Sequence, residues 1–151
     1  MKSILLAAAT CGVLIAASQP VQAAPAQEPA LAPFSQFIDA MNKGDVQTAS
    51  ATFAPSPTII DEFSPFTWHS FAAWNQDLGA DFKAGQVSDF HITLSPVSFK
   101  KVDASHGYGV VPSTLTFKVK GKATTEKGMF TFSTVKAAAG WRITGWAWST
   151  L

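Results

Sequence analysis

The chain is short of charged residues, and it contains a single cysteine and a single tyrosine. Only 14% of its 151 residues are charged, with 11 Lys and Arg against 10 Asp and Glu, whereas about 25% is usual for a soluble domain. A net charge of +1 excludes a nucleic-acid binder that neutralises phosphates with an excess of basic residues. The 12 Phe and 5 Trp residues exclude a disordered chain, because they supply ample material for a core.

Several chemical motifs are also missing. The sequence has no Gly-rich phosphate loop, no nucleotide-binding fingerprint and no nucleophile elbow. Its three histidines do not show the close spacing of metal ligands, so we expect no metal site and no cofactor.

The longest apolar run is too short for a membrane helix. It extends from Ile4 to Ala17, and a membrane span needs about 20 apolar residues. Lys2 precedes the run and residues 21–23 fit a small-x-small cleavage site, which is the pattern of a secretory signal peptide. We therefore predict that residues 1–23 are a signal peptide cleaved after Ala23. The protein is then exported to the bacterial periplasm and keeps no stable membrane anchor.

Cleavage would remove the only cysteine, Cys11, and leave 128 of the 151 residues with no net charge. Such a domain has neither a disulfide nor thiol chemistry, and its stability must come from a packed core. Its charges are divided, because residues 24–99 carry eight acids and two lysines while residues 100–151 carry eight bases and two acids. We interpret this as an acidic helical half packed on a basic sheet half, with a binding patch as the alternative.

Helical patterns come first in the chain. Residues 24–32 are rich in Ala, Pro and Gln, and we expect a flexible lead-in there. The apolar spacing predicts a helix from Pro33 to about residue 41 and a second one, capped by Asp45, that includes Phe53. A short strand over residues 58–61 and a loop over 63–69 follow. Ser70 is positioned to cap a third helix that ends near Gly85.

The second half of the chain has the alternation of β-strands. We predict four long strands, over residues 91–102, 108–120, 124–136 and 141–149, with a bulge or an edge at Pro96. Three helices segregated to one side of a mostly antiparallel sheet make an α+β domain. A strongly curved sheet covered by helices on one face tends to enclose a pocket.

Particular residues resemble a known superfamily. The runs 37–45, 51–54 and 58–61 are similar to the start of nuclear transport factor 2-like (NTF2-like) domains, which include SnoaL-like polyketide cyclases and ketosteroid isomerases. Residues 140–143 with Ser149 resemble their final strand. The resemblance implies a cone-shaped α+β fold over residues 33–151 with a pocket between helices and sheet. It also implies a homodimer formed through the sheet.

The chain resembles ketosteroid isomerases in one of the three groups that their reaction uses, which are a general base and two oxyanion donors. The general-base aspartate falls on Asp61, whereas the oxyanion-hole tyrosine falls on Phe37 and the second oxyanion acid falls within residues 129–135, which hold no acid. That reaction needs a base for the α-proton and donors for the enolate oxygen. The resemblance therefore argues against the isomerase reaction and leaves another acid/base step open.

Two residues are candidates for catalysis, Asp61 and His69. Asp61 and Glu62 are adjacent, so on a strand they point to opposite faces and only one of them enters a pocket. On the functional interpretation Asp61 lies in an apolar cavity with a raised pKa. The alternative is a loop carboxylate that caps a backbone or pairs with Lys. His69 lies in the loop before the third helix, and its alternative is a plain loop or core histidine.

Aromatic residues supply the candidate pocket lining and a candidate interface. We expect Phe37, Trp68, Trp74 and Tyr108 to line the pocket, with the outer sheet face as the alternative for Tyr108. Trp146 and Trp148 share one face of the last strand, opposite the face that holds Trp141 and Ile143. A sheet with two apolar faces is covered on both sides, so we expect a dimer partner on Trp146 and Trp148 unless Gly145 marks a bulge.

Three functions remain open from the sequence. The first is an exported pocket protein that binds a small apolar molecule, without assigned chemistry. The second is an acid/base enzyme of the isomerase, cyclase or dehydratase type that uses Asp61. The third is a non-catalytic module for dimerisation or protein interaction.

Overall fold

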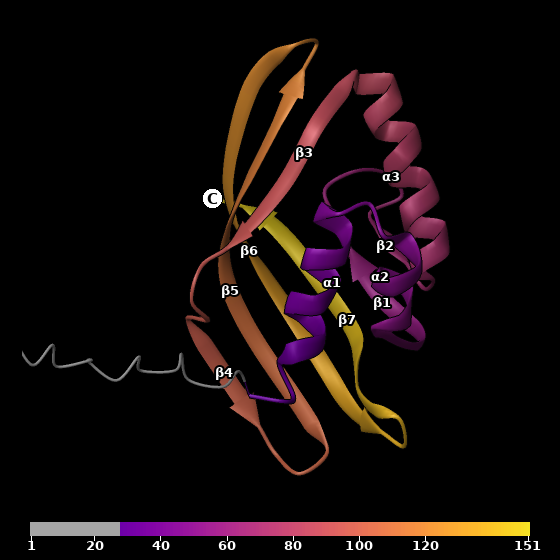
Figure 1. Cartoon of the computed structure of the whole chain (residues 1–151), viewed down its shortest axis with the longest axis vertical. Helices are drawn as coiled ribbons and strands as arrows, with labels where there is room; N and C mark the ends of the chain where they lie inside the picture. The colour runs from indigo at the N-terminus through magenta and orange to yellow at the C-terminus, as the bar shows by residue number, and fades with distance from the viewer. Residues whose placement is uncertain (1–27) are drawn as a thin grey trace, which may run out of the picture.

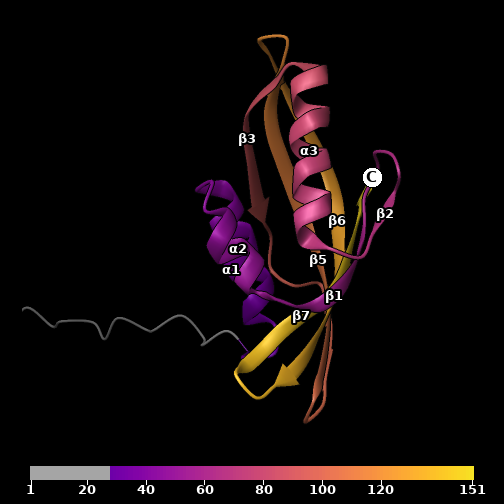
Figure 2. The same ribbon diagram turned by 90° about the vertical axis from the view of Figure 1, so that its right-hand side faces the viewer.

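Three helices cover one face of a strongly curved seven-stranded sheet (Figures 1 and 2). The computed structural model describes residues 28–151, so the predicted signal peptide lies outside the described residues. The helices are α1 (Ala32–Asn42), α2 (Val46–Ala51) and α3 (Phe71–Gly85). The strands are β1 (Phe53–Ile60), β2 (Thr67–Trp68), β3 (Val87–Leu94), β4 (Phe99–Val102), β5 (His106–Val119), β6 (Lys122–Ala137) and β7 (Gly140–Thr150). The α+β architecture is confirmed. Within residues 28–151 no helix is long and apolar enough to span a membrane.

The sheet is mixed, with one parallel pair. Its order is β2-β1-β7-β6-β5-β3, and β4 pairs with β5 beside β3. Only β1 and β7 run parallel, and every other pair is antiparallel. The single strand predicted over residues 91–102 is in fact two strands, because the chain leaves the ladder around Pro96, which has no N–H to donate.

The predicted helix caps are confirmed. The Asp45 carboxylate accepts a hydrogen bond from the Thr48 N–H at 3.0 Å, and the Ser70 hydroxyl accepts one from the Ala73 N–H at 3.4 Å. These bonds satisfy backbone donors that the first turn of a helix leaves unpaired. The helix α3 ends at Gly85, as predicted, and Gln86 after it takes the left-handed cap conformation.

Two further predictions about the first half of the chain were wrong, namely the inclusion of Phe53 in the second helix and the start of the following strand at residue 58. The second helix ends at Ala51, so Phe53 is buried as the first residue of β1. Pro55 and Pro57 lie inside β1, where the register against β7 shifts between Phe53 and Thr58 and their missing N–H groups are tolerated.

The lead-in is not flexible over residues 28–32. Ala30 and Leu31 are buried, and the Ala30 carbonyl accepts a hydrogen bond from the Thr134 hydroxyl at 2.7 Å. Glu28 forms an ion pair with Lys100 on β4 at 2.6 Å. The chain is therefore fixed to the sheet before α1 begins.

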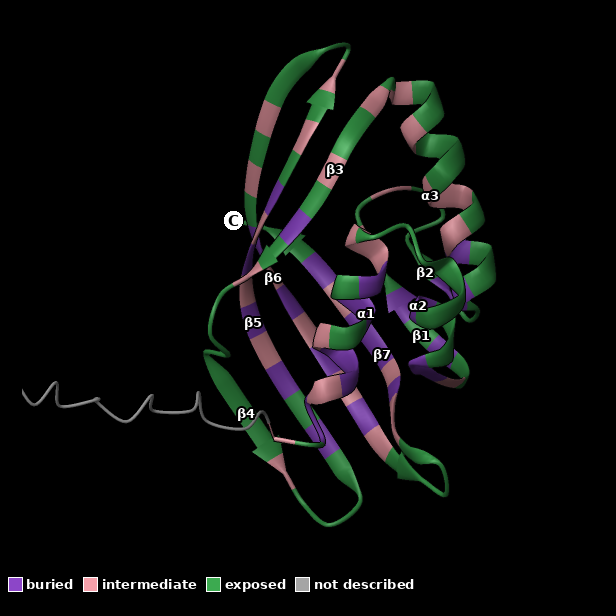
Figure 3. Ribbon diagram, viewed as in Figure 1, coloured by how far each residue is buried: buried purple, intermediate pink, exposed green. Residues whose placement is uncertain are grey.

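The core between helices and sheet is dominated by aromatic rings. Phe34 of α1 stacks on Phe132 of β6 with ring centroids 4.2 Å apart, and Phe37 meets Phe53 edge-on at 5.1 Å. Figure 3 shows the buried residues along the middle of β5, β6 and β7, on the face below α1. Such ring pairs stabilise a core by about 0.5–1.5 kcal/mol each beyond the area that they bury.

A β-bulge in β7 decides which face its tryptophans occupy. Ser133 of β6 pairs with Gly145 while Thr134 pairs with Ile143, so Thr144 is an extra residue on β7. One extra residue reverses the alternation of the strand. Ile143, Trp146 and Trp148 consequently share the buried face under the helices.

The prediction that Trp146 and Trp148 form a dimer face was therefore wrong. Their exposed fractions are 4% and 7%, and both belong to the core of a single chain. The outer face of the sheet instead presents the partly exposed Ile60, Phe99 and Tyr108. Dimerisation through the sheet stays a prediction that follows from the resemblance to NTF2-like domains, and Trp146 and Trp148 no longer support it.

Two glycines on β6 and β7 permit close approaches that shape this region. A Cβ at Gly145 would lie 2.5 Å from the Thr58 carbonyl oxygen of β1, and that neighbour is backbone. A Cβ at Gly128 would lie 2.4 Å from the ring of Trp148. The ring of Trp148 therefore lies over a position that has no side chain.

Replacing Gly145 with alanine is expected to destabilise the fold. The new methyl group would push β1 away from β7, and overpacking of this kind lowers the free energy of unfolding by about 1–3 kcal/mol. Urea denaturation measures the change. In the control Gly79→Ala, on an open position of α3, stability should rise by about 0.5–1 kcal/mol. Equal stability of Gly145→Ala and the wild type would contradict the argument.

Candidate functional site

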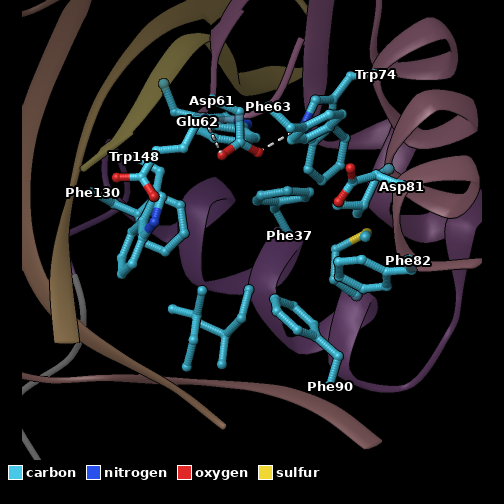
Figure 4. A pocket seen from close by; sticks show the side chains of 15 residues that line it. Phe37, Asp61, Glu62, Phe63, Trp74, Asp81, Phe82, Phe90, Phe130 and Trp148 are labelled. Atoms are coloured by element: carbon cyan, nitrogen blue, oxygen red, sulfur yellow. Dashed lines mark hydrogen bonds between the residues drawn. The ribbon is translucent and has the colours of Figure 1, made fainter. Parts of the chain in front are cut away.

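A cavity of about 200 Å³ lies between α1, α3 and the sheet (Figure 4). Most of its wall is apolar. The apolar lining residues are Phe37, Met41, Phe63, Trp74, Leu78, Phe82, Phe90, Ile92, Leu115, Phe130, Trp146 and Trp148. The charged lining residues are Asp61, Glu62 and Asp81, and no Lys, Arg or His lines the cavity.

Asp61 is held in a fixed orientation at the wall of the cavity. It follows the last residue of β1, where the chain turns toward β2 and the Asp61 N–H donates to the Phe66 carbonyl at 3.2 Å. One carboxylate oxygen accepts from the Trp74 indole N–H at 2.9 Å, and the other accepts from the Glu62 backbone N–H at 2.9 Å (Figure 4). Each oxygen keeps a further lone pair for a ligand.

Burial raises the pKa of Asp61 above its usual value of 3.8. The hydrogen bonds from Trp74 and from the Glu62 backbone oppose this shift, and the carboxylates of Glu62 and Asp81 add to it. Desolvation and like charges both disfavour the ionised form, so Asp61 holds a proton more readily than an exposed aspartate does.

Glu62 lines the same cavity, although the sequence placed it on the opposite face from Asp61. The strand ends at Ile60, so the two side chains no longer alternate. The Glu62 carboxylate accepts from the Thr150 N–H at 2.6 Å and from the Thr150 hydroxyl at 2.7 Å. Glu62 thereby joins the loop after β1 to the end of β7.

The other predicted site residues divide between the cavity and places outside it. Phe37 and Trp74 line the cavity with Asp61. Trp68 is buried beside it, where its indole N–H donates to Asp77 at 2.8 Å. His69 lies in a separate surface depression at the start of α3.

Tyr108 also lies away from the cavity. It is 39% exposed on the outer face of the sheet and packs against Phe99 at 6.0 Å. The buried glycines on either side of it, Gly107 and Gly109, set the alternation that turns Tyr108 outward. Its predicted place in the pocket lining was wrong.

Asp81 is a lining residue that the sequence argument missed. It lies on α3 seven residues after Trp74 and three after Leu78, which places it on the same side of the helix. The spacing was visible in the sequence. The apolar stripe of the helix does not indicate Asp81, because this residue is charged although it lies on the same side.

Trp146 contributes an unpaired donor to the lining. Among the buried side-chain nitrogen and oxygen atoms of residues 28–151, its indole Nε1 is the one without a hydrogen-bond partner. The ring packs edge-on against Trp74 at 5.1 Å and against Phe130 at 5.5 Å. Buried indole N–H groups usually have a partner, so this one marks an incomplete environment.

The described residues offer no group of ligands for a metal. Nowhere in residues 28–151 do three His, Cys, Asp or Glu side chains come together in a way that would hold an ion.

The architecture is that of NTF2-like proteins. The chain matches a ketosteroid isomerase-like protein from Erwinia carotovora atroseptica SCRI1043 with a TM-score of 0.66 and 17% identity, over 82% of this chain and 94% of that one. It matches an NTF2-like superfamily protein from Salmonella enterica serovar Typhimurium LT2 with a TM-score of 0.66 and 14% identity, over 79% and 86%. At these identities the likeness concerns the fold.

Within this fold, the chain can be assigned to one family. The family model of the SnoaL-like domain matches residues 31–151, and the chain belongs to this family. The match begins next to α1 and includes every described strand. A search of curated proteins finds no match.

Removal of the Trp74 donor is expected to raise the pKa of Asp61 further. The indole hydrogen bond favours the ionised carboxylate, so Trp74→Phe should favour the protonated form. Titration of the side-chain carboxyl carbon by NMR measures the shift. Trp68→Phe, which removes the comparable bond to Asp77, should leave the pKa of Asp61 in place. A lower or unchanged value in Trp74→Phe would refute the assigned role of the indole.

Proposed function

We propose that the protein binds a small, largely apolar molecule in the cavity between α1, α3 and the sheet. The observation that carries the proposal is an aromatic wall interrupted by one oriented, partly buried carboxylate, that of Asp61. Ligand pockets typically combine an apolar lining with a few placed polar groups that fix orientation. The signal peptide predicted for residues 1–23 would place this binding outside the cytoplasm.

The unpaired donor of Trp146 supports the proposal. A buried N–H without a partner costs about 1–3 kcal/mol, and a ligand with an acceptor atom would remove that cost. The N–H is closed to solvent, so such a ligand would have to move a neighbouring ring.

The proposal is tested with a neutral bicyclic probe, naphthalene-2-methanol. Isothermal titration calorimetry should detect its binding, and Leu78→Trp should weaken it about tenfold or more because the larger ring fills the cavity. The control is Ala72→Trp, an exposed position on α3 outside the lining, and it should bind as the wild type does. Absence of binding, or equal affinity in Leu78→Trp, would refute the proposal.

Proton transfer by Asp61 is a second candidate function. The raised pKa of Asp61 lies closer to neutral pH than that of an exposed aspartate. A group whose pKa is near the working pH both takes and returns a proton efficiently. Phe37 has no hydroxyl to donate to a developing oxyanion, so the isomerase arrangement is incomplete. Trp146 lines the cavity and has an unpaired N–H, which could donate there only after a neighbouring ring moved. One structural neighbour carries the name ketosteroid isomerase-like, which agrees with acid/base chemistry.

Exchange of α-protons in 2-tetralone tests this second function. Asp61 would take the proton from carbon, the C–H electron pair would form the enolate, and a deuteron from D₂O would replace the proton. NMR should then show exchange that falls about 100-fold in Asp61→Asn. Asp39→Asn, an exposed position of α1 outside the lining, should keep the wild-type rate. The same rate in Asp61→Asn would exclude Asp61 as the base.

A further inference from the structure

The charged groups of the cavity all have the same sign. Asp61, Glu62 and Asp81 come from two elements far apart in the sequence, and the remaining lining residues are uncharged. They belong to the acidic half of the chain, residues 24–99. The basic residues, by contrast, belong mainly to β4 to β7.

No Lys, Arg or His of residues 28–151 forms an ion pair with these carboxylates. The ion pairs found among residues 28–151 join Lys100 to Glu28, His106 to Asp103 and Lys118 to Asp89. Asp61 is hydrogen-bonded by the neutral N–H groups of Trp74 and Glu62, and Glu62 by the neutral groups of Thr150. The negative potential therefore remains uncompensated inside a concave site of low polarity, where fields are strongest.

The apolar wall suits a cation as well. Phe37, Trp74, Trp146, Phe130 and Trp148 surround the same space, and the faces of aromatic rings attract ammonium groups. Figure 4 shows the labelled carboxylates of Asp61 and Asp81 among these rings.

We infer that the ligand of this cavity is an apolar amine, whose protonated nitrogen lies at Asp61 and Asp81 while its hydrocarbon body lies against the aromatic wall. The inference rests on the proposed function and narrows it from apolar molecules in general to cations. Anionic ligands of the same shape are disfavoured, because three carboxylates repel them and no basic residue of the lining receives their charge.

Three probes of one shape test the inference, namely 2-naphthylmethylamine, naphthalene-2-methanol and 2-naphthoate. At neutral pH they are a cation, a neutral molecule and an anion. In calorimetry at low salt, the amine should bind about tenfold more tightly than the alcohol, and the naphthoate should bind most weakly. One favourable contact between an ammonium group and a carboxylate of the lining contributes on this order. Added NaCl should reduce the advantage of the amine by screening.

The carboxylates are tested with substitutions that remove charge and keep shape. Asp81 lies on an exposed part of α3, and Asp81→Asn should weaken the amine about fivefold and the alcohol by a smaller factor. Asp61→Asn should weaken the amine more than the alcohol, and Asp39→Asn, outside the lining, should leave the binding of both probes as in the wild type. Thermal unfolding confirms that each variant is folded.

The outcomes separate the inference from the proposed function. If the alcohol binds as tightly as the amine, or if Asp81→Asn and Asp61→Asn weaken both equally, the preference for a cation is refuted and the apolar pocket stands. If none of the three probes binds, both the inference and the proposed function are refuted.

Discussion

The contact between β1 and β7 is the one on which the cavity depends. Gly145 lets the two strands approach until a carbonyl of β1 occupies the space of a side chain. The bulge beside it, at Thr144, turns Trp146 and Trp148 toward the helices. The parallel pairing also brings the end of β1, and with it Asp61, beside the end of β7. A cavity wall and its carboxylate are thus fixed by one local irregularity of the sheet.

Burial and hydrogen bonding act on Asp61 in opposite directions. Its position in an apolar wall raises the pKa, while the indole of Trp74 and the backbone of Glu62 stabilise the ionised carboxylate. The balance keeps the side chain oriented without pairing it to a protein cation. Such an arrangement leaves the charge available to whatever enters the cavity, because a protein ion pair would have neutralised it in advance.

Much of the fold was predictable from the sequence, because in long segments the spacing of the apolar residues indicates whether the segment is a helix or a strand. The helix with Phe34 and Phe37, the cap at Ser70 and the strands from residue 108 onward follow from apolar spacing and turn residues. The two-residue strand β2 is too short to show any period. The first part of β1 was missed because its two prolines indicate a loop rather than a strand.

The site was predictable only where a resemblance or a helix face pointed to it. Asp61 followed from the resemblance, and Trp74 lay on a visible helix face. The side of the sheet taken by Trp146 and Trp148 was not predictable, because one inserted residue reverses the alternation of a strand without changing its composition. Glu62 lines the cavity together with Asp61 because β1 ends at Ile60. The ends of strands are poorly marked in a sequence, so this position was not predictable.

The missing side chain at Gly128 has a consequence for the wall of the cavity. Trp148 lies over that position, so the depth of the cavity beside β7 depends on a residue behind the wall. A methyl group there would lie 2.4 Å from the indole of Trp148 and 2.5 Å from the backbone carbonyl oxygen of Ser149, so it would displace both the ring and the adjoining strand. The shape of the cavity wall is therefore tied to the pairing of β6 and β7 through a residue that does not itself line the cavity.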